Sequence, residues 1–112
     1  MMNLPTYEND HYILDNAEER HKESPESFWI PSREIRESLV PGTLVKLIFS
    51  MEVEVGSDEI SVERMWVEVT QIGSGYYVGR LDNDPYGSSC VQCDQTVHFL
   101  ACHVIDVYEE EV

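Results

Sequence analysis

The stretch TLVKLIFSM, from Thr43 to Met51, decides the fold, because apolar residues recur along it with a period of two. That period is typical of a β-strand and not of an α-helix. Val45, Leu47 and Phe49 are therefore expected on the core face of the strand, together with Met51. The opposite face also carries apolar residues, so we expect the N-terminal helices and the Phe-Trp pair at 28–29 to cover it.

Working outward, the same alternation predicts further short strands, separated by residues that favour turns. Gly73-Ser74-Gly75 predicts a hairpin turn, and Asp84-Pro85-Tyr86-Gly87 has the residues of a type I turn. The expected strands after Met51 are Glu63–Ile72, Tyr76–Leu81, Gln95–Leu100 and Val104–Tyr108.

Two short helices are expected before the strands. A helix over Asp15–Glu23 is expected to begin at its first residue, whose carboxylate would cap it. A second helix over Arg33–Leu39 has Ser32 as its N-cap. Ile35 and Leu39 lie four positions apart, so they are expected to share the face toward the core.

Helices followed by a run of strands predict an α+β protein. We expect short N-terminal helices packed on a curved antiparallel β-sheet or a small, partly open barrel. The chain divides into a polar N-terminal arm at 1–27, a single α+β domain at 28–108 and an acidic tail at 109–112.

The charge of the chain restricts its partners. Twenty-two acids against seven bases give a net charge of −15 over 112 residues, and residues 41–112 alone carry −10. Such a field repels nucleic acid and anionic membranes and attracts a basic protein. The chain shows no signal peptide and no apolar run near the roughly 20 residues of a membrane span, so a cytoplasmic protein, monomeric or homodimeric, is expected.

The candidate partner-binding residues are acids near one turn and polar or aromatic residues near the strand ends. Acids at the turn would steer association, and a tryptophan would supply the desolvated anchor. Burial of the tryptophan beneath a helix is the structural alternative. The candidates are Glu52, Glu54, Asp58, Glu59, Trp66, Arg80, Asp82, Asn83, Asp84 and Tyr86.

The cysteines raise a weaker hypothesis of metal or redox chemistry. The spacing of a zinc knuckle is approached by Cys90, Cys93, His98 and Cys102. However, part of this stretch is predicted to be a β-strand, and the stretch is not basic. Cys90 and Cys93 also match C-x-x-C, although no helix follows them as a redox motif requires. The sequence therefore predicts no metal and no cofactor.

Several segments together resemble a known family. They are FWIPSR (28–33), VKLIF (45–49), ERMWVEV (63–69) and YVGRLDNDP (77–85), followed by Asp94, VHF (97–99) and HVID (103–106). The sequence resembles the YegJ-like small bacterial domains of unknown function over roughly residues 28–107. The resemblance implies a compact bacterial domain with no established catalytic residues, and by analogy an immunity role. The three cysteines depart from the family's pattern.

We therefore expect a non-enzymatic, acidic interaction domain that binds a protein partner. An inhibitor of the immunity type, which caps a basic toxin such as a nuclease, is the sharpest version of this hypothesis. The alternative is a small-ligand-binding or enzymatic domain. Its site would lie around the turn after the third strand, at Arg80, Asp82, Asn83 and His103.

Overall fold

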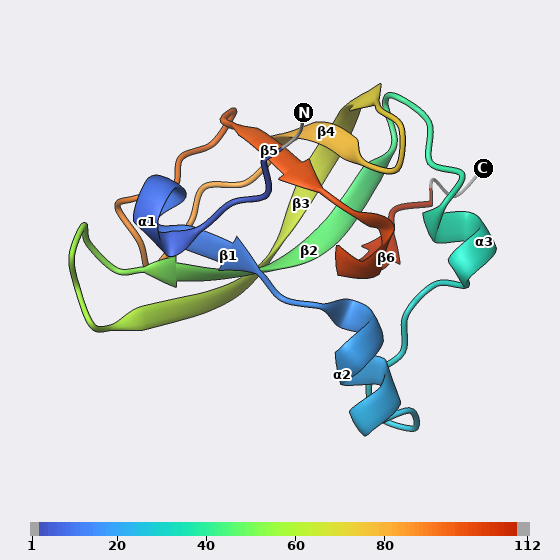
Figure 1. Cartoon of the computed structure of the whole chain (residues 1–112), viewed down its shortest axis with the longest axis horizontal. Helices are drawn as coiled ribbons and strands as arrows, with labels where there is room; N and C mark the ends of the chain where they lie inside the picture. The colour runs from blue at the N-terminus through green and yellow to red at the C-terminus, as the bar shows by residue number, and fades with distance from the viewer. Residues whose placement is uncertain (1–2, 110–112) are drawn as a thin grey trace.

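A six-stranded antiparallel sheet forms the centre of the molecule. The computed structural model describes residues 3–109. The strands are β1 (Tyr12–Leu14), β2 (Leu44–Glu52), β3 (Ile60–Ile72), β4 (Tyr77–Leu81), β5 (Thr96–Phe99) and β6 (Val104–Val107). The long β2–β3 hairpin crosses the whole molecule, as Figure 1 shows.

The sheet is curled, and its central strand β2 is paired along both edges. β3 occupies one edge of β2, while β1 and β6 share the other. β4 and β5 extend the sheet from β3, and the short 3-10 helix η1 (Ala101–His103) leads from β5 into β6. The result is an antiparallel half-barrel preceded by short helices, which confirms the predicted α+β class.

The inner face of the half-barrel holds the main core. Val45, Leu47 and Phe49 of β2 are fully buried, as the alternation predicts. Val67 of β3 lies opposite Val45 in the register and is also fully buried. Gly79 of β4 allows this close packing, since a Cβ there would lie 2.4 Å from a methyl group of Val67.

A smaller apolar cluster covers part of the outer face. Ile48 of β2 packs there with Ala17, Ile30 and Ile105, and Phe28 lies against them. The prediction that N-terminal residues cover this face is therefore confirmed for those residues. It is wrong for Trp29, which remains 70% exposed.

The helices are α1 (Tyr7–Asp10), α2 (Ala17–Glu23) and α3 (Arg33–Arg36). The cap predicted for α2 is wrong by one residue, since the side chain of Asn16 accepts from the N–H of Glu19. Asp15 stays extended because its N–H donates to the carbonyl of Ile48 and so prolongs the pairing of β1.

The third helix is shorter than expected and buries a different residue. Ser32 caps α3 as predicted, but the helix ends at Arg36, three residues before Leu39. Leu39 is buried, whereas Ile35 is 47% exposed, so the expected apolar face is wrong. Arg36 is buried in its place.

Arg36 ties three segments of the chain together. Its guanidinium donates to the carbonyl of Pro31 (2.8 Å), the carbonyl of Ala101 (3.1 Å) and the carboxylate of Glu18 (2.5 Å). Planar donors in a fixed fork suit several acceptors at once. Burial of this charge is therefore compensated by hydrogen bonds from α2, η1 and the segment before α3.

Replacing Arg36 with methionine is expected to lower the free energy of unfolding by about 2–4 kcal/mol, since two carbonyls and a carboxylate lose their donor. Arg33→Met is the matched control, because the exposed Arg33–Glu37 pair should contribute less than about 1 kcal/mol. Urea denaturation of both variants measures the difference. Equal losses would contradict the role given to Arg36.

The turn predicted over residues 84–87 is replaced by another arrangement. In a closed type I turn, Gly87 would donate its N–H to the carbonyl of Asp84. Instead, the N–H groups of Tyr86 and Gly87 donate to the carboxylate of Glu63, at 2.8 and 2.7 Å. The loop is thus held by β3 and not by its own backbone.

Within residues 3–109, no helix combines the length and the apolar character needed to cross a bilayer. Of the expected acidic tail, Glu109 is described and exposed. The remainder of that tail, residues 110–112, lies outside the described residues.

Candidate interaction surface

Three strands place an aromatic pair on the outer face of the sheet. The register sets Lys46 of β2 between Trp66 of β3 and Asp106 of β6. The Lys46 ammonium lies 4.6 Å from the Trp66 ring centroid, and the Tyr108 ring meets Trp66 edge-on at 5.9 Å. Trp66 therefore binds a cation within the fold itself, as an electron-rich ring face can.

A third aromatic residue lies near Asp106, the β6 partner of Lys46. Trp29 lines a hollow of about 190 Å³ together with Ile35, Asp106 and Glu109. We call the surface formed by Trp29, Lys46, Trp66, Asp106 and Tyr108 the aromatic face. Trp29 is 70% and Tyr108 54% exposed, so two of its rings offer apolar area to a partner.

Asn83 and Asp82 are brought to Trp66 as structural partners. The N–H of Trp66 donates to Oδ1 of Asn83 at 2.5 Å, and the N–H of Asp82 donates to the carbonyl of Trp66 at 2.9 Å. These bonds fix the position of the tryptophan backbone. The side chain of Asp82 remains exposed, as does that of Asp84.

Arg80 lies on the exposed face of β4 and pairs with acids. Its guanidinium donates to Glu68 at 2.9 Å and lies 3.7 Å from Asp94. The hydrogen bond to Glu68 raises the pKa of Arg80, so the group stays charged. Both partners belong to the sheet and its loops, and this pair joins β3 to β4.

Glu52 is one of the acids predicted to bind a partner, but it is held by other residues of the fold. Its carboxylate lies 2.8 Å from Nδ1 of His11, and its side chain is 15% exposed. The hydroxyl of Ser88 also donates to its carbonyl. Glu52 therefore joins β2 to two loops, and its removal would disturb structure as well as charge.

Other acids that were predicted to bind a partner surround the β2–β3 turn. Glu54, Asp58 and Glu59 are exposed there. Glu54 also lines an open hollow with Tyr86, whose side chain is fully exposed. The structure thus brings together two predicted binding residues that lie far apart in the sequence.

The cysteines are free thiols and half-buried. Burial raises the pKa of the Cys93 and Cys102 thiols, which disfavours the reactive thiolate. Among residues 3–109, no three His, Cys, Asp or Glu side chains form a group that could hold a metal ion. The weak zinc candidates Cys90, Cys93, His98 and Cys102 therefore do not assemble.

His103 is the one buried residue of the alternative site. It is buried in η1, where its Nδ1 accepts from the N–H of Leu100 at 3.0 Å. The neutral ring therefore carries its proton on Nε2. Arg80 is exposed on β4 and pairs with Glu68, while Asn83 accepts from the N–H of Trp66, so each of these side chains is engaged by a different partner.

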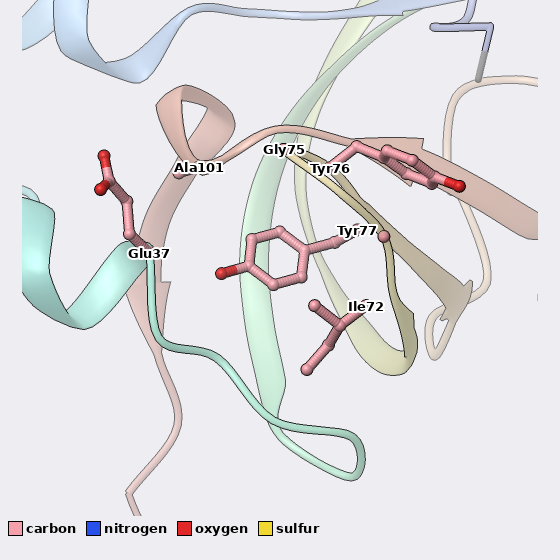
Figure 2. A pocket seen from close by; sticks show the side chains of 7 residues that line it. Glu37, Ile72, Gly75, Tyr76, Tyr77 and Ala101 are labelled. Carbon is pink, nitrogen blue, oxygen red and sulfur yellow. The ribbon is translucent and has the colours of Figure 1, made fainter. Parts of the chain in front are cut away.

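A pocket of about 370 Å³ opens between α3, η1 and the β3–β4 hairpin. Figure 2 shows the ring of Tyr77 within it, with Ile72 and Glu37 on different sides. The Tyr77 hydroxyl donates to the carbonyl of Arg36 and accepts from the N–H of Leu39. The carboxylate of Glu37 is paired with Arg33 at 2.6 Å. The hydroxyl of Tyr77 and the carboxylate of Glu37 are thus already engaged within the fold.

Sequence reasoning did not find the part played by Trp29, Lys46 or Tyr108. The sequence carries a partial signal, because the period of two places Trp66 on the face of its strand opposite Val67, and Lys46 on the face of its own strand opposite Val45. The pairing of β6 with β2, which brings Tyr108 to Trp66, is a long-range contact that no local pattern contains.

The fold and the surface together define a small half-barrel domain with an acidic exterior and an exposed aromatic face. The chain belongs to DUF2314, a family described as an uncharacterized protein conserved in bacteria, which matches residues 12–109. This confirms the expectation of a bacterial family without known function. The narrower YegJ-like resemblance is not part of that finding. Comparisons with curated proteins and with solved structures gave no match.

Proposed function

We propose that this domain is a non-enzymatic interaction module of the bacterial cytoplasm that binds a basic protein partner through the aromatic face. The observation that carries the proposal is the Trp66 platform, where Lys46 already stacks at 4.6 Å. Lysine or arginine side chains of a partner would pack in the same manner on Trp29 and Tyr108. Aromatic residues with a polar rim are typical of binding hot spots.

The charges around this surface favour a basic partner. The protein carries a net charge of −15, and Glu68, Asp82 and Glu109 lie close to the aromatic face. Lys46 is its one base, and it is already engaged with Trp66. An acidic surface raises the association rate of a basic protein through long-range attraction.

The finer form of the proposal is an immunity-type inhibitor of a basic toxin such as a nuclease. Glu54, Asp58 and Glu59 would then occupy the phosphate-binding cleft of the toxin. The YegJ-like resemblance, which implies an immunity role by analogy, supports this finer form. A gene for a basic toxin next to the gene for this protein would support the inhibitor form, and its absence across many genomes would argue against it.

Association kinetics with a partner captured from the native host test the proposal. The triple variant Glu54→Gln, Asp58→Asn, Glu59→Gln is expected to slow association about tenfold at 0.1 M salt, where the Debye length is roughly 10 Å. At 1 M salt, the variant and the parent should converge. Trp66→Ala should instead raise the dissociation rate by at least tenfold.

The matched control is Glu19→Gln, Glu23→Gln, Glu26→Gln, which removes the same charge from exposed acids in and just after α2. In Figure 1, α2 lies below the sheet, whereas the β2–β3 turn lies at the left. Control and test variants with equal on-rates would show that the acids act only through total charge. An on-rate indifferent to salt would remove the support for a steered, basic partner.

A further inference from the structure

β3 is much longer than the strand that pairs with its second edge. It spans thirteen residues, but β4 pairs with Val67–Ile72 only. The first half of β3 is paired with β2 on one side alone. An edge of this kind presents unpaired N–H and C=O groups in a row.

The alternation of hydrogen bonds along an antiparallel strand identifies the unpaired groups. Val69 exchanges backbone hydrogen bonds with the segment before β2, so the odd-numbered residues of β3 point toward β2. The even-numbered residues Ile60, Val62 and Arg64 must then point away from it. Within residues 3–109, none of their backbone groups has a hydrogen-bond partner on that edge.

Asn83 ends this open edge. The next even-numbered residue, Trp66, is satisfied by the side chain of Asn83 and the N–H of Asp82. The open segment therefore runs from Ile60 to Arg64, a length of about 17 Å at 3.4 Å per residue. It borders Trp66, so the edge and the aromatic face are continuous.

The side chains of the open segment are unusual for an unprotected edge. Ile60 is 45% and Val62 55% exposed, and both are β-branched. Native edges are commonly protected by proline, lysine or a covering loop. Here, the loop at Tyr86 and Gly87 is bound by Glu63 and lies against the side chain of Ser61. The loop therefore contacts the face that Ser61 and Glu63 share with Met65, while Ile60, Val62 and Arg64 remain exposed.

The acidic residues at both ends of the edge favour a basic segment as its binding partner. Asp58 and Glu59 precede the open segment, and Asp82 and Asp84 follow it in space. Arg64 is the one base of β3, and its guanidinium lies 5.6 Å from the Phe28 ring. A second copy of this chain would bring a net charge of −15 against the same charge. A basic segment would instead be attracted at both ends.

We propose that residues 60–64 of β3 accept an extended, basic segment of the partner protein as an added β-strand. Backbone hydrogen bonds to Val62 and Arg64 would provide affinity, as in other cases of strand addition. Lysine or arginine at alternate positions of the segment would face the acids and Trp66. This inference rests on the proposed function and specifies the manner of binding.

The experiment uses a synthetic probe, an acetylated and amidated eight-residue peptide that alternates lysine with valine. Amide hydrogen exchange is measured by NMR on the labelled protein. In the free protein, the amides of Val62 and Arg64 should exchange at least tenfold faster than those of Glu63 and Met65, which are bonded to β2. Saturating peptide should slow exchange at Val62 and Arg64 at least tenfold and leave the two odd-numbered amides unchanged.

Two control peptides test the contribution of backbone and charge. One carries N-methyl groups on two adjacent central residues, which blocks both edges of the peptide, and it should lose the protection. The other replaces lysine with glutamate and should not bind. Val62→Pro is the matched protein variant, since it removes an N–H that the fold does not use. It should lose the protection at Arg64.

The outcomes separate this inference from the proposed function. Peptide binding that shifts Trp66 but survives N-methylation, with Val62 and Arg64 unprotected, would overturn strand addition and leave the basic partner in place. Lysine and glutamate peptides that bind equally would overturn both. Slow exchange at Val62 and Arg64 in the free protein, with the mass of a dimer by sedimentation, would assign the edge to a second copy.

Discussion

Val67→Asp is expected to unfold the domain at room temperature. Val67 is fully buried at the centre of the half-barrel, where β3 pairs with both β2 and β4. A carboxylate there would lie among apolar side chains with no basic partner. The cost of burying it is about 5 kcal/mol or more, which is comparable to the whole stability of a domain of this size. Thermal denaturation followed by circular dichroism measures the effect.

Val62→Asp is the matched control, because it makes the same substitution on the same strand at a side chain that is 55% exposed. It should change the stability by less than about 1 kcal/mol. If Val67→Asp melted within a few degrees of the parent, the inner face of β3 would have to be reassigned.

Acidification is expected to destabilise the protein through His103. Burial lowers the pKa of His103 from 6.5 to about 4, although the nearby carboxylate of Asp15 opposes this shift. Protonation would also abolish the acceptor that binds the N–H of Leu100. Since the folded state prefers the neutral ring, this stabilisation is complete above about pH 6.5 and is lost as the pH falls to about 4. The loss amounts to about 3 kcal/mol.

The measurement is urea denaturation at intervals between pH 7.5 and 4. Because carboxylates also titrate in this range, the parent is compared with His103→Gln, which retains an acceptor but does not titrate. The variant should lose about 3 kcal/mol less than the parent across the range. Parallel curves for the parent and His103→Gln would contradict the assignment.

Local pattern was sufficient to predict the principal strands. The period of two in β2 indicates which side chains meet the core, so Val45, Leu47 and Phe49 were placed correctly. The helices were predicted less well, because α1 and α3 have only four residues each. Helices of this length depend on tertiary contacts for their stability, and their sequences carry little periodicity.

The candidate surface was predicted in part. Trp66 and the acids of the β2–β3 turn were identified from residue type and position. Their partners were not, since Tyr108, Lys46 and Asn83 reach Trp66 through pairing across the sheet. Glu52 was predicted to bind a partner, but its carboxylate contacts His11. His11 is distant from Glu52 in the sequence and adjacent to it in space, so no local pattern could show this contact.

The sequence by itself determined the α+β class, the inner faces of the long strands and the acidic character of the exterior. These follow from period and composition, which are local or additive properties of a chain. The tertiary structure alone decided that Arg36 and His103 are buried, that Trp29 remains exposed and that one half of β3 has an open edge. Each of these depends on where segments distant in sequence come together, and the physical reason is that burial and edge pairing are properties of the assembled sheet.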